Sequence, residues 1–290
     1  RMAARLGAPA PRRAAAVRRP AFPAELRART GGGGRVRAAL RIAAVLVVGI
    51  GGGLLWRAAP WRGAAASTHV AMREFAAERG ERAIVRLSDS TRIVLAAESR
   101  LWVPNDFGVR ARSVRLEGEA YFEVAHDAAK PFVVHAARAV TQVLGTQFSV
   151  RAYPGDQRVD VVVRSGRVAL RAADAPPAAG TVLTRGDAGH LDSAGTMTVA
   201  RHVDVDAALA WTTGRLAFDK VPFRDVAREI ERWYGLSIQL ADPALADRRV
   251  TASFADESSD EVLDALALLV NARVERHGTA ATFRAKPSQP

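Results

Sequence analysis

Cysteine is absent from the 290 residues of the chain. Its absence excludes a disulfide framework, a thiol nucleophile and every cysteine-based metal site. Histidine is sparse, and its copies lie apart without the spacing of metal ligands, which favours surface or packing roles. The six histidines are His69, His126, His135, His190, His202 and His277. The sequence therefore predicts neither a metal centre nor a bound cofactor.

Most of the chain also lacks a surplus of either charge. Residues 1–62 hold 13 arginines and one acid, a surplus that accounts for the whole net charge of +12. Residues 63–290 hold 29 basic and 29 acidic residues. Contacts between the arginines and nucleic-acid phosphates are one physical explanation. Anchoring beside a membrane explains the same arginines, and the neutral remainder does not suit a nucleic-acid surface. We therefore predict no nucleic-acid partner.

The N-terminal region contains one long uncharged run. Residues 1–38 are rich in Arg, Ala, Pro and Gly and have too little apolar surface to fold, which predicts a flexible tail. Residues 42–56 then carry no charge. We predict a transmembrane helix over residues 39–59. A buried helix of a soluble domain is disfavoured, because no amphipathic helices flank the run. The expected anchors at the membrane interfaces are Arg41, Trp56 and Arg57.

The distribution of arginine predicts the orientation of this helix. Eleven arginines precede residue 42 and only two follow residue 56 closely. The N-terminus is therefore expected in the cytoplasm and the rest of the chain beyond the membrane. A cleaved signal peptide ending at the alanines of residues 64–66 is the competing interpretation. We expect a single-pass protein of the inner membrane, with residues 60–79 as a linker and a periplasmic C-terminal region.

Residues 80–200 contain many short apolar stretches that are separated by turn residues, with no helix between them. This spacing is typical of a β-sandwich, a jelly-roll-like fold or a barrel. The sequence thus predicts an all-β exported domain. The expected strands are 84–87, 92–95, 100–104, 114–124, 132–136, 139–144, 146–153, 160–163 and 166–171, with a final pair at 181–184 and 197–199.

One strand of this domain divides clearly into two faces. Over residues 116–124, side chains alternate between apolar residues and a set made of glutamates and one tyrosine. This pattern predicts a half-buried strand with one solvated side. We expect Glu119→Ala, on that side, to be nearly neutral for stability. The apolar face comprises Leu116, Gly118, Ala120, Phe122 and Val124, and the solvated face comprises Glu117, Glu119, Tyr121 and Glu123.

The three glutamates of this strand also allow a catalytic hypothesis. Paired carboxylates hydrolyse glycosidic bonds, so an exported protein that binds or hydrolyses envelope polysaccharide is the alternative function. No histidine, lysine or second carboxylate motif nearby gives Glu117, Glu119 or Glu123 a partner in catalysis. We therefore predict a binding or scaffold module and not an enzyme.

Residues 211–286, after a linker at 201–210, predict a small α+β domain with the order βαββαβ. Pro222 is expected to open its first helix and Gly235 to end it. Residues 258–261 have the spacing of a capping box and start a second helix. The expected inward residues of that helix are Val262, Leu263, Leu266, Leu269 and Val270.

The last two strands of this small domain, at 273–276 and 280–284, are expected to form an exposed sheet edge. Pairing across such edges is a general way for small sheets to recognise partners. We therefore predict a partner-binding edge here. Its candidate residues are Arg273, Thr282 and Arg284.

Three motifs occur in order in the β region: L-E-G-E-A-Y-F-E-V, P-F-V-V and L-G-T-Q-F-S-V. Together they resemble the FecR family of transmembrane sigma-factor regulators, or anti-sigma factors. The residues that carry this resemblance, in a structural role, are Leu116, Glu117, Gly118, Glu119, Tyr121, Phe122, Pro131, Phe132, Leu144, Gly145, Thr146 and Phe148. The C-terminal domain resembles the short N-terminal domain of secretins and TonB-dependent signal transducers.

The resemblance implies a function in signalling. A cytoplasmic portion is expected to hold an extracytoplasmic-function sigma factor. The exported portion is expected to contact the signalling domain of a TonB-dependent outer-membrane receptor, in a system for uptake of iron or another nutrient. Residues 1–38 lack amphipathic helical periodicity, so sigma-factor binding is implied by the resemblance alone.

One turn departs from the family pattern. The resemblance leads us to expect Asp-Gly in the turn after residue 87, where this chain has Asp89 and Ser90. Serine is less suited than glycine to a positive φ. We therefore expect a strained turn or a turn of another type.

Overall fold

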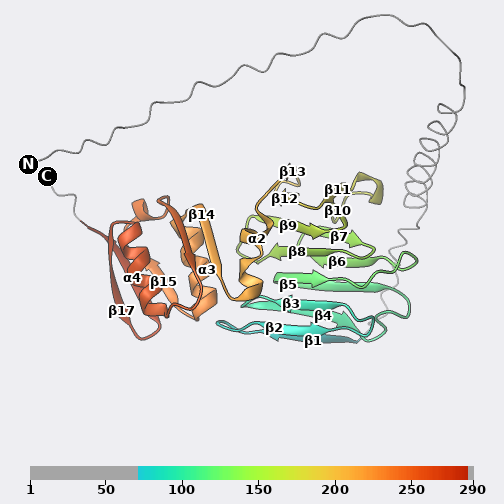
Figure 1. Cartoon of the computed structure of the whole chain (residues 1–290), viewed down its shortest axis with the longest axis horizontal. Coiled ribbons are helices and arrows are strands. Elements are labelled where there is room, and N and C mark those ends of the chain that lie inside the picture. Colours follow the sequence, from blue (N-terminus) through green and yellow to red (C-terminus); the bar gives the residue numbers. More distant parts are fainter. Residues whose placement is uncertain (1–70, 287–290) are drawn as a thin grey trace, which may run out of the picture. The chain divides into compact units, whose positions relative to one another are not determined.

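The computed structural model describes residues 71–286 of the chain (Figure 1). The expected tail and transmembrane helix, with the anchors Arg41, Trp56 and Arg57, lie outside the described residues. Within residues 71–286, no helix is long and apolar enough to cross a membrane. A large β domain is followed by a smaller domain that contains two longer helices. The predicted β-rich architecture is confirmed.

Strand β5 (Arg112–Glu123) is shared by the two layers of the β domain. Its first half pairs with β4 (Ser99–Pro104) and with β6 (Phe132–Ala136). Its second half pairs with β3 (Arg92–Leu95) and with β8 (Gln147–Ala152). The other strands are β1 (Met72–Ala77), β2 (Ala83–Arg86), β7 (Ala139–Val143), β9 (Arg158–Ser165), β10 (Arg167–Ala172), β11 (Thr181–Thr184), β12 (Ala188–Asp192) and β13 (Met197–Ala200).

The strand order shows how β5 joins the layers. One layer has the order β11-β10-β7-β6-β5-β4-β1, and the other has the order β13-β12-β9-β8-β5-β3-β2. Every strand pair within these two layers is antiparallel except the pair of β5 with β6. The two layers therefore form a sandwich with one strand in common, as in other folds whose strands change sheets.

Gly118 lies where β5 passes from one layer to the other. Its φ is +94°, and an added Cβ would lie 2.3 Å from Oγ and 2.8 Å from Cα of Ser99. A side chain is excluded both by this backbone conformation and by the close approach of the neighbouring strand. Glycine at this position allows β5 to cross between layers.

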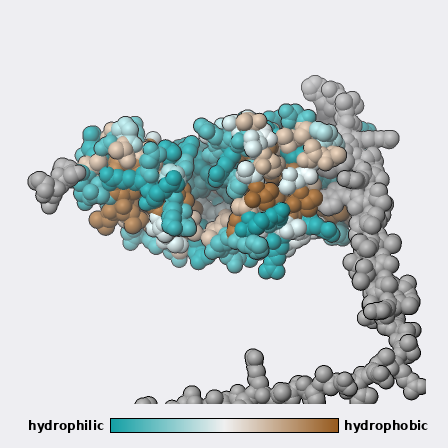
Figure 2. All heavy atoms as spheres, turned by 90° about the horizontal axis from the view of Figure 1, so that it is seen from above, coloured by the Kyte–Doolittle hydropathy of each residue, from teal (hydrophilic) through white to brown (hydrophobic). Residues whose placement is uncertain are grey.

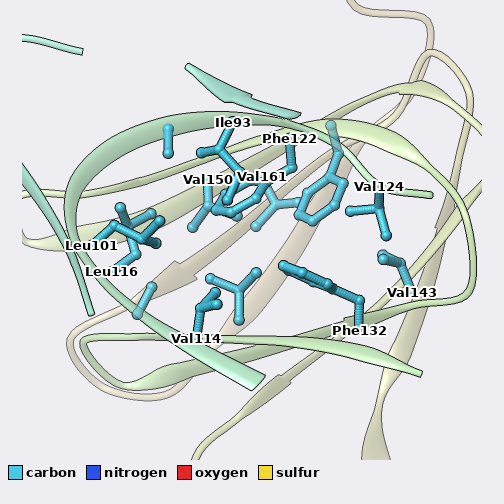
Figure 3. Packing of buried hydrophobic residues seen from close by; sticks show 14 of the residues in the cluster. Ile93, Leu101, Val114, Leu116, Phe122, Val124, Phe132, Val143, Val150 and Val161 are labelled. Atoms are coloured by element: carbon cyan, nitrogen blue, oxygen red, sulfur yellow. The ribbon is translucent and has the colours of Figure 1, made fainter. Parts of the chain in front are cut away.

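The apolar face of β5 forms the centre of the core between the layers (Figure 3). Phe122 is fully buried, and its ring stacks on Phe148 with a centroid distance of 5.1 Å. The ring of Phe132 also lies beside the Phe122 ring, with a centroid distance of 6.0 Å. Every member of the predicted apolar face is buried, which confirms the predicted strand register.

The turn between β2 and β3 places Ser90 at φ 72°. The Asp89 carboxylate stabilises this turn by accepting hydrogen bonds from the backbone N–H and the hydroxyl of Thr91, both at 2.9 Å. It also pairs with the buried Arg112 at 3.1 Å. Ser90 thus adopts the positive φ that a glycine would take with less strain.

Two predicted linkers contain regular structure. The expected linker at 60–79 includes β1, which pairs with β4 along its whole length. The sequence of β1 is rich in charge and its residues are mostly exposed, so it lacks the apolar alternation that identifies a strand. The expected linker at 201–210 includes the short helix α2 (Val205–Ala208), which is capped by the side chain of Asp204.

The predicted pairing of residues 181–184 with 197–199 is wrong. Strand β11 pairs with β10, and β13 pairs with β12, which the sequence pattern did not reveal. Gly189 weakens the pattern of β12. An added Cβ at Gly189 would lie 2.7 Å from the side chain of Leu183, so close packing between layers requires a residue that is a weak strand former.

The C-terminal domain has the order βαββαββ: both strands that were expected after the second helix are present, and the predicted order βαββαβ counted one of them only. Its strands form two separate sheets: β14 pairs with β16, and β18 lies between β15 and β17. Helices α3 and α4 pack with both sheets over a second apolar core. The elements are the 3-10 helix η2 (Ala210–Thr213), β14 (Leu216–Pro222), α3 (Phe223–Tyr234), β15 (Ser237–Leu240), η3 (Pro243–Leu245), β16 (Arg249–Phe254), α4 (Ser259–Leu269), β17 (Ala272–His277) and β18 (Ala280–Ala285).

The ends of the helices agree with the local sequence signals. Helix α3 starts directly after Pro222 and ends at Gly235, which has φ 67°. The predicted capping box of α4 is present between Ser258 and Glu261. Leu269 was expected to face inward and is 52% exposed. The helix ends there, and the buried residues after Leu266 are Ala267 and Val270.

The predicted partner edge is wrong for two of its three residues. Thr282 and Arg284 belong to β18, which is the middle strand of its sheet. Thr282 pairs with Gln239 on one side and with Glu275 on the other. Arg273 lies on β17, an edge strand of this sheet. The parallel pairing of β15 with β18 joins distant parts of the domain, so the order of elements along the chain did not indicate it.

Candidate functional site

The second half of β5 lies against the C-terminal domain, on the face that was expected to be solvated. Glu119 and Tyr121 are each only 7% exposed. Tyr121 belongs to the same apolar cluster as Trp211 and residues of α3. The predicted solvated face is therefore wrong for Glu119 and Tyr121, because a domain that is distant in sequence covers them, while Glu117 and Glu123 are partly exposed.

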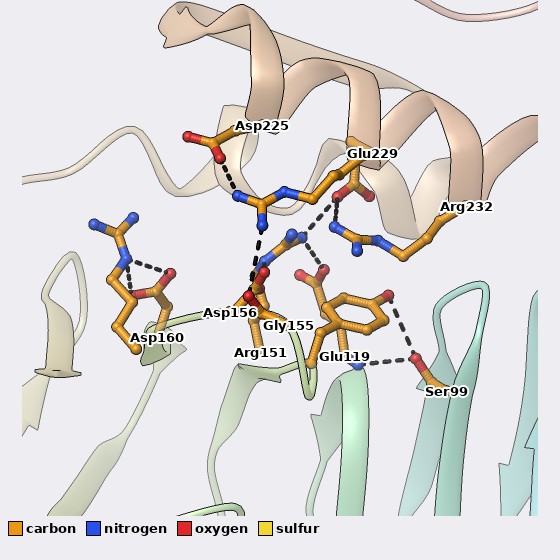
Figure 4. Close-up of polar contacts among 12 residues, drawn as sticks. Ser99, Glu119, Arg151, Gly155, Asp156, Asp160, Asp225, Glu229 and Arg232 are labelled. Atoms are coloured by element: carbon orange, nitrogen blue, oxygen red, sulfur yellow. Dashed lines mark hydrogen bonds and ion pairs between the residues drawn. The ribbon is translucent and has the colours of Figure 1, made fainter. Parts of the chain in front are cut away.

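Arg151 of β8 forms the centre of a polar cluster within this contact (Figure 4). Its Nη1 atom lies 3.0 Å from Oε2 of Glu119 and 2.8 Å from Oε2 of Glu229. Its Nε atom lies 3.0 Å from Oδ2 of Asp156. Glu119 is on β5, Asp156 follows β8, and Glu229 is on α3. One guanidinium thus connects carboxylates from both domains.

Arg232 adds a second guanidinium from α3. Its Nη2 atom lies 3.2 Å from Oε2 of Glu229, and its guanidinium is 4.1 Å from the ring centroid of Tyr153. Arg151 also lies over that ring, at 4.9 Å. The tyrosine ring therefore contacts both cations, an arrangement that stabilises positive charge at a buried site.

Ser99 positions the β5 side of this cluster. Its hydroxyl accepts a hydrogen bond of 2.8 Å from the backbone N–H of Glu119. The hydroxyl of Tyr153 donates a hydrogen bond of 2.8 Å to the carbonyl of Ala97. Both contacts lie beside Gly118, where β5 passes from one layer to the other. The close approach of Ser99 at this point also holds Glu119 opposite Arg151.

The two glutamates have different electrostatic environments. Burial raises the pKa of Glu119 to about 7, and the negative charge of Glu229 adds to this rise, although Arg151 opposes it. Burial also works against ionisation of Glu229, yet Arg151 and Arg232 hold its pKa below the usual value. Near neutral pH the pair therefore gains or loses a proton mainly at Glu119.

The turn between β1 and β2 supplies a second set of contacts to the C-terminal domain. The backbone N–H of Gly80 donates a hydrogen bond of 2.8 Å to the carbonyl of Arg232. Nη1 of Arg82 donates to the carbonyl of Trp211 at 2.9 Å. The same guanidinium lies 5.3 Å from the ring centroid of Trp233. The C-terminal domain thus contacts two separate parts of the β domain.

Most of the motif residues have structural positions. Leu116, Phe122, Phe132 and Phe148 lie in the core, and Leu144, Pro131 and Glu117 are partly exposed. The hydroxyl of Thr146 donates to the carbonyl of Arg167 at 2.9 Å. An added Cβ on Gly145 would lie 2.7 Å from Cα of His126. Of these motif residues, Glu119 and Tyr121 take part in the contact between the two domains.

Sequence reasoning missed Arg151, Asp156, Glu229 and Arg232. Arg151 lies in an expected strand and the two α3 residues in an expected helix, but no local pattern relates one element to the other. The glutamates considered for catalysis do not converge: Glu123 pairs with Arg92 at 3.0 Å on its own sheet, while Glu119 contacts Arg151. Among residues 71–286, no group of three or more His, Asp or Glu is placed to bind a metal ion.

Comparisons with known proteins agree with this two-domain organisation. The family model described as FecR protein matches residues 73–169, and the model described as FecR, C-terminal matches residues 215–282. The chain belongs to the FecR family. No curated protein matches it.

Among the solved structures that resemble the chain are two of a candidate anti-sigma factor from Parabacteroides distasonis. The first is 27% identical, with a TM-score of 0.67, and the match covers 74% of this chain and 99% of the other. The second is 28% identical, with a TM-score of 0.67, and the match covers 74% of this chain and 100% of the other.

Proposed function

We propose that this chain regulates an extracytoplasmic-function sigma factor and relays to it a signal from outside the cytoplasm. The observation that carries this proposal is the match of one candidate anti-sigma factor, over 99% of its length, to a chain that contains both FecR modules. A protein of this kind acts by binding. We propose no catalytic role, because the Glu119 carboxylate forms an ion pair with Arg151.

The proposed location is the inner membrane, with residues 71–286 in the periplasm. The uncharged run at 42–56 and the arginines before it support this orientation. Reporter fusions after Arg29 and after Asp192 test it: the first should be cytoplasmic and the second exported. The reverse pattern contradicts the relay. Val47→Asp should prevent stable insertion, since a central carboxylate costs roughly 2.5–3.5 kcal/mol on insertion scales.

The proposed periplasmic partner is the signalling domain of a TonB-dependent receptor, in a system for iron or another nutrient. The C-terminal domain is the recognition module in this proposal. Its edge strand β17 has hydrogen-bonding groups on one side that β18 does not use. Leu268 and Leu269, the last residues of α4 before this strand, are 73% and 52% exposed. The face seen in Figure 2 is largely hydrophilic, with separate apolar patches.

Co-purification and transcription together test the regulatory role. The full chain, extracted from membranes, should co-purify with a sigma factor of the extracytoplasmic-function class. Deleting its gene should change transcription from promoters that depend on that sigma factor. If no such sigma factor co-purifies and the transcripts are unchanged, the proposal is wrong. The inhibitory or activating sign of the effect follows from the direction of the change.

A further inference from the structure

The cluster around Arg151 carries unequal numbers of positive and negative groups. The carboxylates of Glu119, Asp156 and Glu229 contact the guanidiniums of Arg151 and Arg232. With every group ionised, the cluster has one more negative than positive charge. Glu119 and Arg232 are 7% and 8% exposed, so water screens this imbalance poorly. A single bound proton makes the cluster neutral.

Neighbouring charges do not remove the imbalance. Arg228, on the same helix as Glu229, is paired with Asp225. On the β domain, Arg79 pairs with Glu98 at 3.2 Å, and Arg100 lies 3.8 Å from Glu74. Ser99, which contacts the β5 backbone, is neutral. The groups that face Glu119 are therefore Arg151, Glu229 and Arg232, and the surplus charge stays within the cluster.

The interface also contains polar groups that are buried without a partner. Among the described residues, the buried Nε of Arg232 and Nε1 of Trp211 donate no hydrogen bond to another protein atom. Native interiors satisfy nearly all such groups. Two unsatisfied donors and a surplus buried charge each oppose closure of this interface.

We propose that the Arg151 cluster is a proton-controlled latch between the two domains. The latch is closed when the carboxylates of Glu119 and Glu229 share one proton, and it loosens when both are ionised. The latch concerns contacts within this chain, so it does not depend on which partner the chain binds. Opening separates α3 from β5 and exposes surface of both domains.

The direction of the pH effect follows from the position of the proton. Burial first, and the charge of Glu229 second, raise the pKa of Glu119 in the closed state to about 7 from its usual value of 4.5. The closed state therefore binds more protons than the open state between these values, and closing weakens as pH rises through them. Below pH 4.5 the lowered pKa of Glu229 has the opposite effect.

Hydrogen exchange at Gly80 in the full chain measures the latch even when the open state is rare. The amide of Gly80 donates across the interface to the carbonyl of Arg232. After correction for the intrinsic pH dependence of exchange, its protection factor should fall about tenfold to hundredfold from pH 5 to pH 8. The amide of Val124, which bonds to Thr146 within the β domain, should keep its protection.

Substitutions in β5 test whether Glu119 causes the pH dependence of protection at Gly80. Glu119→Gln should remove most of the pH dependence at Gly80. Glu123→Gln, on the same face of the strand and paired with Arg92, should retain it. Glu229→Gln serves as the second variant if Glu119→Gln does not fold, and it should also flatten the profile. The latch is overturned by a flat profile in the unaltered chain, by an unchanged slope in Glu119→Gln, or by equal loss of protection at Val124.

Discussion

Nη1 of Arg151 and Oε2 of Glu229 lie 2.8 Å apart, although 78 residues separate them in the sequence. Arg151 belongs to a central strand of the β domain and Glu229 to the first long helix of the C-terminal domain. Because the same nitrogen also contacts Glu119, one arginine links three elements. The contact between the domains thus depends on a partly buried charge that has more than one partner.

Removing this charge should destabilise the protein strongly. Arg151→Met leaves Glu119 without its cation in a buried site and leaves Glu229 with Arg232 alone. An uncompensated buried charge of this kind costs about 3–5 kcal/mol. Urea denaturation at pH 7, followed by tryptophan fluorescence, measures the loss. Arg158→Met is the matched control: its side chain is 61% exposed, so its effect should stay within about 0.5 kcal/mol. Equal effects of the two variants contradict the assignment.

The stability of Glu119→Gln should depend on pH relative to the unaltered chain. Ionised Glu119 opposes folding in the buried site, and its pKa there is about 7. The stability supplied by the protonated form is present below pH 4.5 and is lost as pH rises through 7. Glutamine keeps the shape and cannot ionise. The variant should therefore match the unaltered chain near pH 5 and exceed it by about 1–3 kcal/mol at pH 8.

Denaturation midpoints at several pH values between 5 and 8 check this prediction. Glu123→Gln, with a half-exposed side chain paired to Arg92, should run parallel to the unaltered chain. A constant difference between Glu119→Gln and the unaltered chain over this range means that Glu119 does not change protonation there.

The strand that carries Glu119 shows what local sequence can and cannot predict. Its alternation correctly placed Phe122 in the core, because a period of two depends only on neighbouring residues. The same alternation put Glu119 in solvent, which is wrong. Burial of that face depends on α3, and no local pattern encodes the contact. The exposure on which the expected neutrality of Glu119→Ala was based is therefore absent.

In the C-terminal domain too, local features could be predicted from the sequence and long-range pairing could not. Helix ends at Pro222, Gly235 and Ser258 were predictable, since caps depend on a few adjacent residues. The place of β18 in its sheet was not, because its parallel pairing with β15 joins strands that are distant in the chain. The family motifs led to the correct family, while the residues of the Arg151 cluster outside them could only be found in three dimensions.

Gly118→Ala should destabilise the β domain by about 2–4 kcal/mol. The added Cβ would overlap with Ser99, and the φ of +94° disfavours any side chain. Strain at such a backbone position costs on the order of 1–3 kcal/mol, and overpacking adds to it. Thermal unfolding followed by circular dichroism measures the change.

Gly155→Ala is the control for this substitution. Gly155 has no atom within 4 Å of an added Cβ, and its φ is not positive. Its alanine variant should unfold within about 2 °C of the unaltered chain, in line with a surface change of at most 0.5 kcal/mol. If Gly118→Ala is equally mild, then β5 can cross between the layers without glycine.

The edge of the C-terminal sheet gives the last prediction. Thr282→Pro interrupts β18, which pairs on both sides, and should unfold the C-terminal domain because a central strand does not tolerate proline. Arg273→Glu, on the edge strand β17, should leave the fold intact and weaken binding to the receptor's signalling domain at least tenfold. Circular dichroism and calorimetric titration of the full chain separate the two outcomes.

Arg158→Glu, a charge reversal at an exposed site of the β domain, controls for the change in net charge. If it weakens binding as much as Arg273→Glu, or if Arg273→Glu binds as tightly as the unaltered chain, the partner does not use β17.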